Sequence, residues 1–360
     1  MTRLAGLSSP SLSPARRGSA RPPAPGGVCY RAGVQDFFSL TPDALLDAVE
    51  AALGGGARAT GRCYTLNSLE NRVYDLELED DRRVVAKFYR PGRWSRAAIL
   101  QEHALLAELL AAEVPVVAPL TLADGGTLQA LQSGILFAVF PRVVGRCLQE
   151  LADPQLLQIG RLLARLHNVA AARPATERPT LTPRAYGEPA LAALLASGFI
   201  AEPLRARYEQ TARALIAAAE PLWQGVTLHR LHGDCHLGNL LWQDSRPFFL
   251  DFDDLLSGPA VQDVWMVIRG RDAEAVRQRE LLLAGYQQMR DFDRRTLRLI
   301  EPLRGLRLIH YASWVARRFA DPIFPRTFPH FPTTQHWVDE LAALQETLAC
   351  IQDEPSWQYE

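Results

Sequence analysis

Apolar residues recur with two different spacings along the chain, and the change of spacing divides it into regions. Residues 42–53 place them three or four positions apart, after Thr41 and before Gly54, which predicts a capped helix. Beyond this helix the spacing shortens to the alternation of half-buried strands. Five such runs occur, at residues 62–66, 72–78, 83–89, 126–131 and 135–140. We therefore expect an antiparallel sheet, with a helix over residues 96–111 inserted after its third strand.

The rest of the chain is dominated by helical spacing. The expected helices cover residues 154–167, 188–196, 203–219, 273–288, 295–319 and 334–350. A sheet-rich first part followed by a helical second part predicts the α+β class. We place the boundary at Pro141, so that residues 35–141 form one region and residues 142–360 the other. Residues 1–34 are rich in Pro, Gly, Ser and Arg and lack hydrophobic periodicity, which is typical of a disordered extension.

Composition excludes several classes of protein. The chain of 360 residues is 48% hydrophobic and has a formal net charge of −1, so its charge balance favours neither nucleic acid nor an anionic membrane as a partner. No apolar run approaches the roughly 20 residues that a membrane-spanning helix needs. The five cysteines are scattered and odd in number. This usage indicates a reducing, cytoplasmic compartment rather than a disulfide framework.

The strongest chemical signal lies in the second region. The stretch His232-Gly-Asp-Cys-His-Leu-Gly-Asn239 is followed by two short apolar runs at 240–242 and 248–250, and then by Asp251. The runs and the polar residues between them predict a β-hairpin that brings Asn239 and Asp251 together. Carboxylate and amide oxygens suit Mg²⁺. Asp234 lies five positions before Asn239, as does the base of a kinase catalytic loop. The pattern predicts a phosphoryl-transfer site with Asp234 as base and Asn239 and Asp251 as metal ligands.

Two other interpretations of this stretch stay open on sequence alone. His232, Cys235 and His236 are potential zinc ligands, although no second Cys or His pair follows at ligand spacing. Cys235 beside two histidines is also a potential nucleophile, although neighbours in a loop rarely point at one another. We expect His232 to be neutral and to hydrogen-bond within the loop. We expect Asp263 to connect the helix that follows to this loop.

Lys87 is the only lysine in the chain, and every other basic residue is an arginine. A compact ammonium is therefore expected to be needed at this position, in the middle of the third strand. On the following helix Glu102 falls on the apolar side, where a carboxylate requires a cationic partner. Lys87 is the natural partner, because a kinase pairs a strand lysine with a helix glutamate near the nucleotide phosphates. Alternatively Glu102 is solvated at the edge of the apolar stripe, and Glu108 is then the next candidate.

Two further segments are expected to contact a nucleotide. The connection between the first two strands, Leu66-Asn-Ser-Leu-Glu-Asn71, lies where a glycine-rich phosphate loop would be expected, yet it contains no glycine. Asn67 and Ser68 are small polar residues that can bind phosphate oxygens, or they simply form a turn. The segment from Phe140 to Val144 follows the last strand and is expected to be a hinge whose backbone receives adenine.

Taken together, these residues resemble the aminoglycoside phosphotransferase and choline kinase superfamily. The resemblance rests on the stretches quoted above and on three others, and it spans residues 35 to about 330. These three are Val85-Ala-Lys-Phe-Tyr-Arg-Pro-Gly-Arg-Trp94, Gly258-Pro-Ala-Val-Gln-Asp-Val-Trp265 and Ile300-Glu-Pro-Leu-Arg304. It implies a two-lobed, protein-kinase-like fold with an antiparallel-sheet N-lobe and a mainly helical C-lobe. It further implies that Asp234 is the catalytic base, that Asn239 and Asp251 bind Mg²⁺, and that Ser68 contacts ATP.

Within this superfamily, the sequence more specifically resembles bacterial members that phosphorylate protein Ser/Thr residues during stress. Our main hypothesis is therefore an ATP- and Mg²⁺-dependent protein Ser/Thr kinase, monomeric and cytoplasmic. The same core also serves kinases of small alcohols such as choline, homoserine or aminoglycosides, so this alternative stays open. A degenerate kinase acting as a binding module would need a missing catalytic group, and the sequence retains them all.

Overall fold

The computed structural model describes residue 37 and residues 40–353, so the extension expected over residues 1–34 lies outside the described residues. A five-stranded sheet follows the first helix, α1 (Pro42–Leu53), in the order β1-β2-β3-β5-β4. All neighbouring strands in it are antiparallel, as the sequence predicts. The strands are β1 (Ala59–Leu66), β2 (Arg72–Leu78), β3 (Arg83–Phe88), β4 (Gln129–Ala130) and β5 (Leu136–Pro141).

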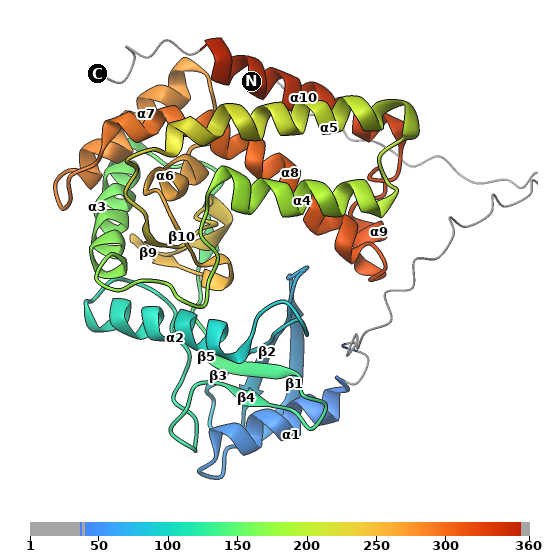
Figure 1. The fold of residues 1–360 in the computed structure, drawn as a ribbon. Helices are drawn as coiled ribbons and strands as arrows, with labels where there is room; N and C mark the ends of the chain where they lie inside the picture. Colours follow the sequence, from blue (N-terminus) through green and yellow to red (C-terminus); the bar gives the residue numbers. More distant parts are fainter. Residues whose placement is uncertain (1–36, 38–39, 354–360) are drawn as a thin grey trace, which may run out of the picture. The chain divides into compact units, whose positions relative to one another are not determined.

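A helix packs on each face of this sheet, as Figure 1 shows. On one face, α1 buries Leu45 and Val49 against alternate residues of β2, β3 and β5, including Ala86 and Phe88. On the other face, α2 (Arg96–Ala111) buries Ile99 against Ala138 and Tyr89. Because side chains alternate along a strand, Lys87 points to the α2 face, away from α1. We call residues 40–141 the sheet lobe.

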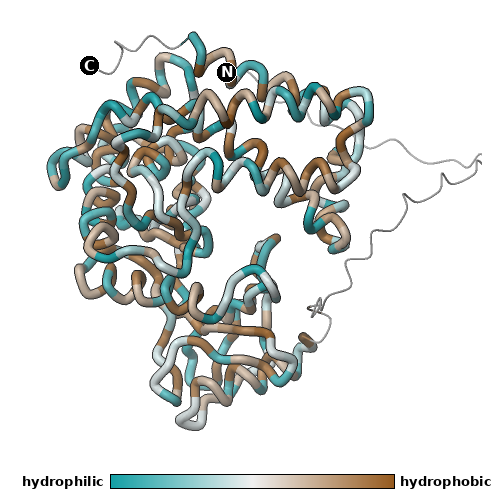
Figure 2. The backbone as a smooth tube through the Cα atoms, in the orientation of Figure 1, coloured by the Kyte–Doolittle hydropathy of each residue, from teal (hydrophilic) through white to brown (hydrophobic). Residues whose placement is uncertain are grey.

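The remaining described residues form what we call the helical lobe, residues 142–353. Its helices are α3 (Asp153–Ala170), α4 (Pro183–Ser197), α5 (Glu202–Ala219), α6 (Val261–Val267), α7 (Ala273–Tyr286), α8 (Ile300–Arg318), α9 (Ile323–Thr327) and α10 (Thr334–Asp353), with short 3₁₀ turns η2 (Glu220–Trp223), η3 (Leu237–Asn239), η4 (Phe252–Asp254) and η5 (Arg294–Leu299). Helices α4, α5, α8 and α10 pack on one another around one hydrophobic core. Hydrophobic and hydrophilic residues alternate along these helices (Figure 2).

Helices α3 and α7 cross closely at two glycines. A Cβ at Gly160 would lie 2.0 Å from the carbonyl oxygen of Leu282, and one at Gly285 would lie 2.2 Å from that of Leu157. Any side chain at either position would therefore force the two backbones apart. This contact fixes α3 against the core that also contains Leu231, Leu240 and Phe249, which flank residues 232–254 or lie within them.

Two small sheets in the helical lobe hold the segment singled out by the sequence. Strand β7 (His229–Leu231) pairs antiparallel with β10 (Leu256–Gly258). Strand β8 (Leu240–Gln243) pairs with β9 (Arg246–Phe249) as the predicted hairpin, and with β6 (Arg146–Cys147) on its other side. Asp244 has a positive φ of 53° in the hairpin turn. Residues 232–254 are therefore anchored at both ends by sheet pairing.

Some predicted elements differ from the observed ones for identifiable reasons. The single helix expected over 295–319 is instead the 3₁₀ turn η5 followed by α8. Pro302 explains the break, because a proline lacks an N–H and is tolerated in the first turn of an α-helix but not in its interior. The helix expected to start at Glu188 begins at Pro183, where the Thr182 side chain accepts a hydrogen bond from the N–H of Ala185. Of the described helices, none has the combined length and apolar character needed to cross a membrane.

Candidate active site

The catalytic segment is held in shape by one buried carboxylate on α6. Asp263 is fully buried, and its two oxygens accept hydrogen bonds from the N–H groups of His232 and Gly233, each at 2.9 Å. It also contacts Nε2 of His167 at 3.0 Å. Burial raises the pKa of Asp263, but these hydrogen bonds and the nearby imidazoles outweigh it and the pKa lies below its usual value. The connection predicted between Asp263 and the loop is therefore confirmed.

A glycine is required at the turn that precedes Asp234. Gly233 has φ of 86°, and a Cβ added to it would lie 2.1 Å from the carbonyl oxygen of Asp254. The backbone just before Asp234 is thus in close contact with the backbone at Asp254, which follows Asp251. His232 strengthens this approach, since its Nε2 lies 2.7 Å from the carbonyl oxygen of Leu250. The loops on the two sides of the hairpin are locked together.

The hairpin brings the three predicted oxygen-bearing residues into one place. The side-chain amide of Asn239 donates to the carbonyl oxygen of Asp234 at 2.9 Å, and the backbone carbonyl oxygen of Asn239 accepts a hydrogen bond from the N–H of Leu250. Asp251 follows directly, with a left-handed backbone at φ 57°. Such a conformation is uncommon for a residue other than glycine, and it orients the carboxylate into the cleft. Asp251 remains 54% exposed there.

Lys87 reaches across from the sheet lobe to this group. Its Nζ lies 3.0 Å from Asp251, 3.3 Å from Asp253 and 3.8 Å from Glu102. Lys87 itself is 7% exposed. Burial lowers the pKa of Lys87, but the three carboxylates outweigh this effect and the pKa lies well above its usual value. The only ammonium side chain of the chain is therefore fixed as a cation beside Asp251.

Glu102 faces inward as predicted, yet Lys87 is its more distant partner. Arg178, in the loop before α4, donates to Oε2 of Glu102 at 2.9 Å and to the carbonyl oxygen of Asp253 at 2.7 Å. The Arg178 guanidinium also stacks on Trp94 at 4.3 Å. Burial raises the pKa of Glu102 to about 7, although Lys87 and Arg178 lower it. The carboxylate thus depends on two cations, one of them from the helical lobe.

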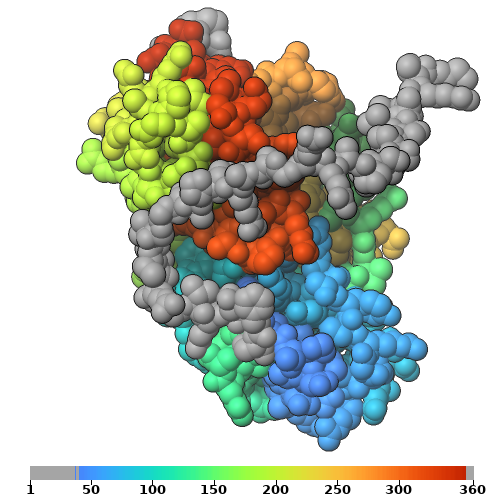
Figure 3. Space-filling view, turned by 90° about the vertical axis from the view of Figure 1, so that its right-hand side faces the viewer, coloured from blue at the N-terminus to red at the C-terminus, as the bar shows by residue number. Residues whose placement is uncertain are grey.

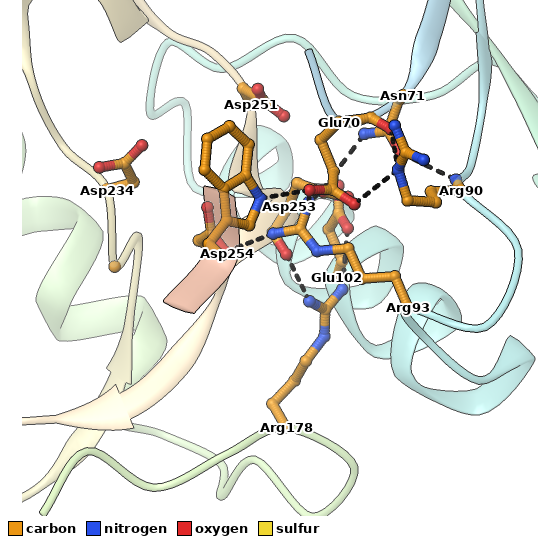
Figure 4. Close-up of polar contacts among 12 residues, drawn as sticks. Glu70, Asn71, Arg90, Arg93, Glu102, Arg178, Asp234, Asp251, Asp253 and Asp254 are labelled. Carbon is orange, nitrogen blue, oxygen red and sulfur yellow. Dashed lines mark hydrogen bonds and ion pairs between the residues drawn. The ribbon is translucent and has the colours of Figure 1, made fainter. Parts of the chain in front are cut away.

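Further arginines surround Asp253 and Asp254, as Figure 4 shows. Arg93, from the turn before α2, pairs with both carboxylates. Asn71 donates to Asp253 at 3.2 Å. Burial raises the pKa of Asp253, but Lys87, Arg93 and Arg178 outweigh it and hold the pKa below its usual value. The structure therefore places a second ionised carboxylate, two residues after Asp251, at the centre of the contacts between the lobes.

The loop expected to hold phosphate is fastened to the helical lobe. Glu70 pairs with Arg318 of α8 at 2.6 Å and accepts a hydrogen bond from the Trp314 indole. Nearby, Asp321 pairs with Arg72 at 3.2 Å and with Arg90 at 3.0 Å. Figure 3 shows the end of α8 and α9 against the first strands of the sheet lobe. A glycine-free loop here is consistent with a segment held by specific ion pairs.

The predicted nucleotide-binding residues line one cavity of about 1800 Å³ between the two lobes. Ser68 and Phe140 line it together with Lys87, Glu102, Asp234, Asn239 and Asp251. The Ser68 hydroxyl accepts a hydrogen bond from the N–H of Asn71 at 3.3 Å, so in this structure it also forms the predicted turn. Phe140 lies on β5, opposite Val85 of β3. The structure therefore brings all seven predicted site residues to a single cleft.

The sulfur-based interpretations of the loop receive no support. Cys235 is fully buried, and burial raises the pKa of its thiol well above the usual value, the opposite of what a nucleophile requires. Within the described parts of the chain, no group of three or more His, Cys, Asp or Glu residues is arranged to hold a metal ion. This statement does not cover sites in which an amide oxygen, such as that of Asn239, is one of the ligands.

Sequence reasoning missed several residues of the site. Arg93, Arg178, Asp253 and Glu70 all bridge parts of the cleft, as does Arg307 of α8, which lies 2.9 Å from Asp234. One signal was present in the sequence: Asp251, Asp253 and Asp254 follow an apolar run, so their carboxylates must find cations. The two arginines of the Arg90-Pro-Gly-Arg93 turn are the nearest candidates along the sheet lobe. Nothing in the sequence around Arg178 distinguishes it.

Comparisons with known proteins show which family the chain is similar to. The model of the phosphotransferase enzyme family matches residues 65–300. Stress response kinase A of Escherichia coli K12 is 41% identical over 327 residues, which cover 89% of this chain and 96% of the relative. A protein named serine/threonine protein kinase RdoA, from Salmonella typhimurium, is 40% identical over 328 residues, with the same coverage of both chains.

Solved structures show the same fold at low sequence identity. An amicoumacin kinase in complex with AMP-PNP, Ca²⁺ and Ami is 18% identical, with a TM-score of 0.67 over 91% of this chain and 96% of that one. A microcompartment-associated aminopropanol kinase is 19% identical, with a TM-score of 0.64 over 86% and 95%. The kinase-like α+β fold with a sheet N-lobe is thereby confirmed. On the family match, the identity to stress response kinases and the shared fold, the chain belongs to the phosphotransferase enzyme family.

Proposed function

We propose that this phosphotransferase is an ATP- and Mg²⁺-dependent protein serine/threonine kinase. The observation that carries the proposal is the placement of Lys87 against Asp251 in a cleft that also contains Asp234. The protein acceptor rests on the names of relatives about 40% identical over nearly their full length. By the same similarity we propose a role in the stress response, as a cytoplasmic monomer.

ATP is proposed to lie between the lobes, with its adenine near Phe140 and its phosphates near Lys87 and Ser68. Lys87 is buried and positively charged, and it would bind phosphate oxygens when the Asp251 carboxylate binds Mg²⁺ instead of the Lys87 ammonium. Glu102 and Asp253 hold the ammonium in position, and Arg178 and Arg93 hold those two carboxylates. The cleft exceeds the roughly 300–1,000 Å³ of a small-molecule pocket, so a nucleotide leaves space for part of an acceptor chain.

The residues present fit a divalent cation. Asp251 presents a half-exposed carboxylate to the cleft, and Asn239 offers an amide oxygen beside it. The buried Oδ1 of Asp253 accepts no hydrogen bond from the described residues, and the cation in contact with it is Nζ of Lys87 at 3.3 Å. These are the hard oxygen ligands that Mg²⁺ prefers. When bound, the ion would neutralise charge on the phosphate oxygens.

Asp234 is proposed to accept the proton of the acceptor hydroxyl. The hydroxyl oxygen attacks the γ-phosphorus, the bond from phosphorus to the β,γ-bridging oxygen breaks, and the proton passes to the Asp234 carboxylate. Burial raises the pKa of Asp234, but His236 and Arg307 outweigh it and the pKa lies below its usual value. The carboxylate is therefore ionised and able to accept a proton at neutral pH.

The proposal is tested with labelled ATP, Mg²⁺ and a general protein substrate, followed by phosphoamino-acid analysis. Phosphoserine and phosphothreonine are expected with the natural chain. Asp234→Asn, which keeps the side-chain size, should lower the rate by roughly 10²–10⁴-fold. Label transfer that persists in Asp234→Asn would refute the assigned base. Rapid turnover of one small alcohol, with no transfer to protein, would instead favour the small-molecule alternative.

A further inference from the structure

One face of α8 forms the wall of the cleft beside Asp234. His310, Tyr311, Trp314 and Arg318 follow Arg307 at spacings of three and four residues, which places them on one side of the helix. All of them line the cleft. Tyr311 is 46% exposed and stacks with Trp314 at 5.4 Å. This face of α8 therefore borders the space from which an acceptor hydroxyl can reach Asp234.

Every carboxylate that lines the cleft is already paired with a cation. Glu70 and Asp321 pair with arginines of the sheet lobe and α8, and Asp253 and Asp254 pair with Arg93. Glu102, Asp234 and Asp251 pair with Arg178, Arg307 and Lys87, respectively. Asp234 and Asp251 are in addition the proposed base and metal ligand, and Glu102 and Asp253 hold the Lys87 ammonium. No carboxylate in the described cleft is left for a positively charged acceptor.

Two arginines near this wall, Arg317 towards the end of α8 and Arg326 on α9, form no ion pair with any described residue. Arg317 and Arg326 both line the cleft, and both side chains are exposed. Arg317 donates a hydrogen bond to the carbonyl oxygen of Pro189 at 3.2 Å, and neither arginine has a carboxylate partner among the described residues. Their charge is therefore available to a ligand. The acceptor side of the cleft is basic, although the whole chain has a net charge of −1.

We propose that the acceptor is an acidic Ser/Thr-containing protein segment whose anionic side chain binds Arg317 and Arg326. This inference rests on the proposed function and specifies its substrate class. Arg307 contacts the proposed base, Asp234, and Arg317 lies ten positions later on α8. Ten positions correspond to about 15 Å along a helix. An extended chain covers this distance in about four to five residues. The anionic residue, whether Asp, Glu or phosphoserine, is thus four to five positions from the phosphorylated hydroxyl.

The experiment compares peptides that share one serine and differ at a single position. Glutamate, phosphoserine, alanine or arginine is placed two to seven residues before or after the serine, and kcat/KM is measured with saturating ATP. The natural chain is expected to prefer glutamate or phosphoserine over alanine by about tenfold, at a separation of four to five. A preference for phosphoserine alone would assign a prior phosphorylation as the source of the charge. The preference should weaken at high salt, because these arginines are exposed.

Variants locate the preference in the two arginines. In Arg317→Ala/Arg326→Ala the ratio of kcat/KM for the acidic and the neutral peptide should fall to near one. In Arg317→Glu/Arg326→Glu the ratio should invert, with the arginine peptide preferred. Arg295→Ala removes an exposed arginine from η5 that forms an ion pair with Asp293, away from the cleft, and it should leave the ratio unchanged.

Two results separate failure of this inference from failure of the proposed function. Peptides phosphorylated at equal rates whatever their charge, or an acidic preference that survives in the double variants, would overturn the acidic acceptor while the kinase function stands. Transfer to no peptide or protein, combined with rapid turnover of a small alcohol, would overturn the proposed function itself.

Discussion

The guanidinium of Arg307 lies 2.9 Å from Oδ1 of Asp234. An arginine on α8 is thus in direct contact with the proposed base, and it lowers the pKa of that carboxylate together with His236. Since a lowered pKa keeps a carboxylate ionised down to more acidic pH, the contact should extend activity on the acid side.

Arg307→Gln is therefore expected to move the acid limb of the kcat/KM profile to higher pH. Removing the cation raises the pKa of Asp234, so the base is protonated sooner as the pH falls. Steady-state rates are measured from about pH 3 to pH 8, because the pKa of Asp234 lies below its usual value of about 3.9. Arg304→Gln, one turn earlier on α8 and paired with Glu301, is the matched control and should leave the limb in place. An unmoved limb in Arg307→Gln would show that the contact does not tune the base.

Replacing the only lysine by arginine should remove most activity. Lys87 is 7% exposed and fits between three carboxylates, where a planar guanidinium cannot take the place of a compact ammonium. We expect Lys87→Arg to lower kcat by roughly 10²–10³-fold, as loss of a preorganised charge does elsewhere. The conservative exchange Arg83→Lys, at an exposed position of the same strand, should have little effect. An undiminished rate in Lys87→Arg would mean that the lysine has no special role.

Loosening the Glu70 loop should speed nucleotide release. Glu70 is 8% exposed and joins the loop between β1 and β2 to Arg318 and Trp314 of α8. Glu70→Gln removes the charge that holds this loop and leaves Arg318 without its carboxylate. We expect faster dissociation of a fluorescent ADP analogue, followed by stopped flow. Glu79→Gln, in the exposed turn after β2, serves as control, and equal dissociation rates for the two variants would contradict a loop that closes over the nucleotide.

Asp263→Asn should lower the free energy of unfolding by about 2–4 kcal/mol. The substitution removes the buried carboxylate that accepts hydrogen bonds from two backbone N–H groups and contacts His167. The pKa of Asp263 is lowered on folding, so its contribution is present above the unfolded pKa of about 3.9 and is lost as the pH falls through the folded value. Urea unfolding at pH 7 and pH 3 measures the difference. The difference in unfolding free energy between the natural chain and Asp263→Asn should be smaller at pH 3 than at pH 7. Asp291→Asn, at an exposed position, should match the natural chain at both pH values.

Much of this site follows from local sequence. The hairpin between Asn239 and Asp251, the lysine in the middle of a strand and the inward-facing Glu102 depend on residues close to one another in the chain, where period and turn chemistry are informative. The structure places all three as expected. The β4 strand is shorter than predicted, at two residues, because it pairs only with β5 at the edge of the sheet.

The contacts that join the lobes are not readable in this way. Arg178 reaches Glu102 from 76 positions away, and Arg318 reaches Glu70 from 248. In a chain that uses arginine at nearly every basic position, no single arginine is distinguished by its type. Lys87 is distinguished because it is the single lysine in the sequence. Burial alone indicated that Glu102 needs a cation, and it did not indicate which one.

The solitary amine of Lys87 also makes the cleft accessible to chemical measurement. Apart from the α-amino group, an acylating reagent has only one amine to modify, and that amine is enclosed by carboxylates where a nucleotide is expected. A single mass increment would then report whether the cleft is open or filled. Occupancy by ATP, by a product or by an inhibitor could be followed in the unaltered protein, without a fluorophore or an engineered reporter.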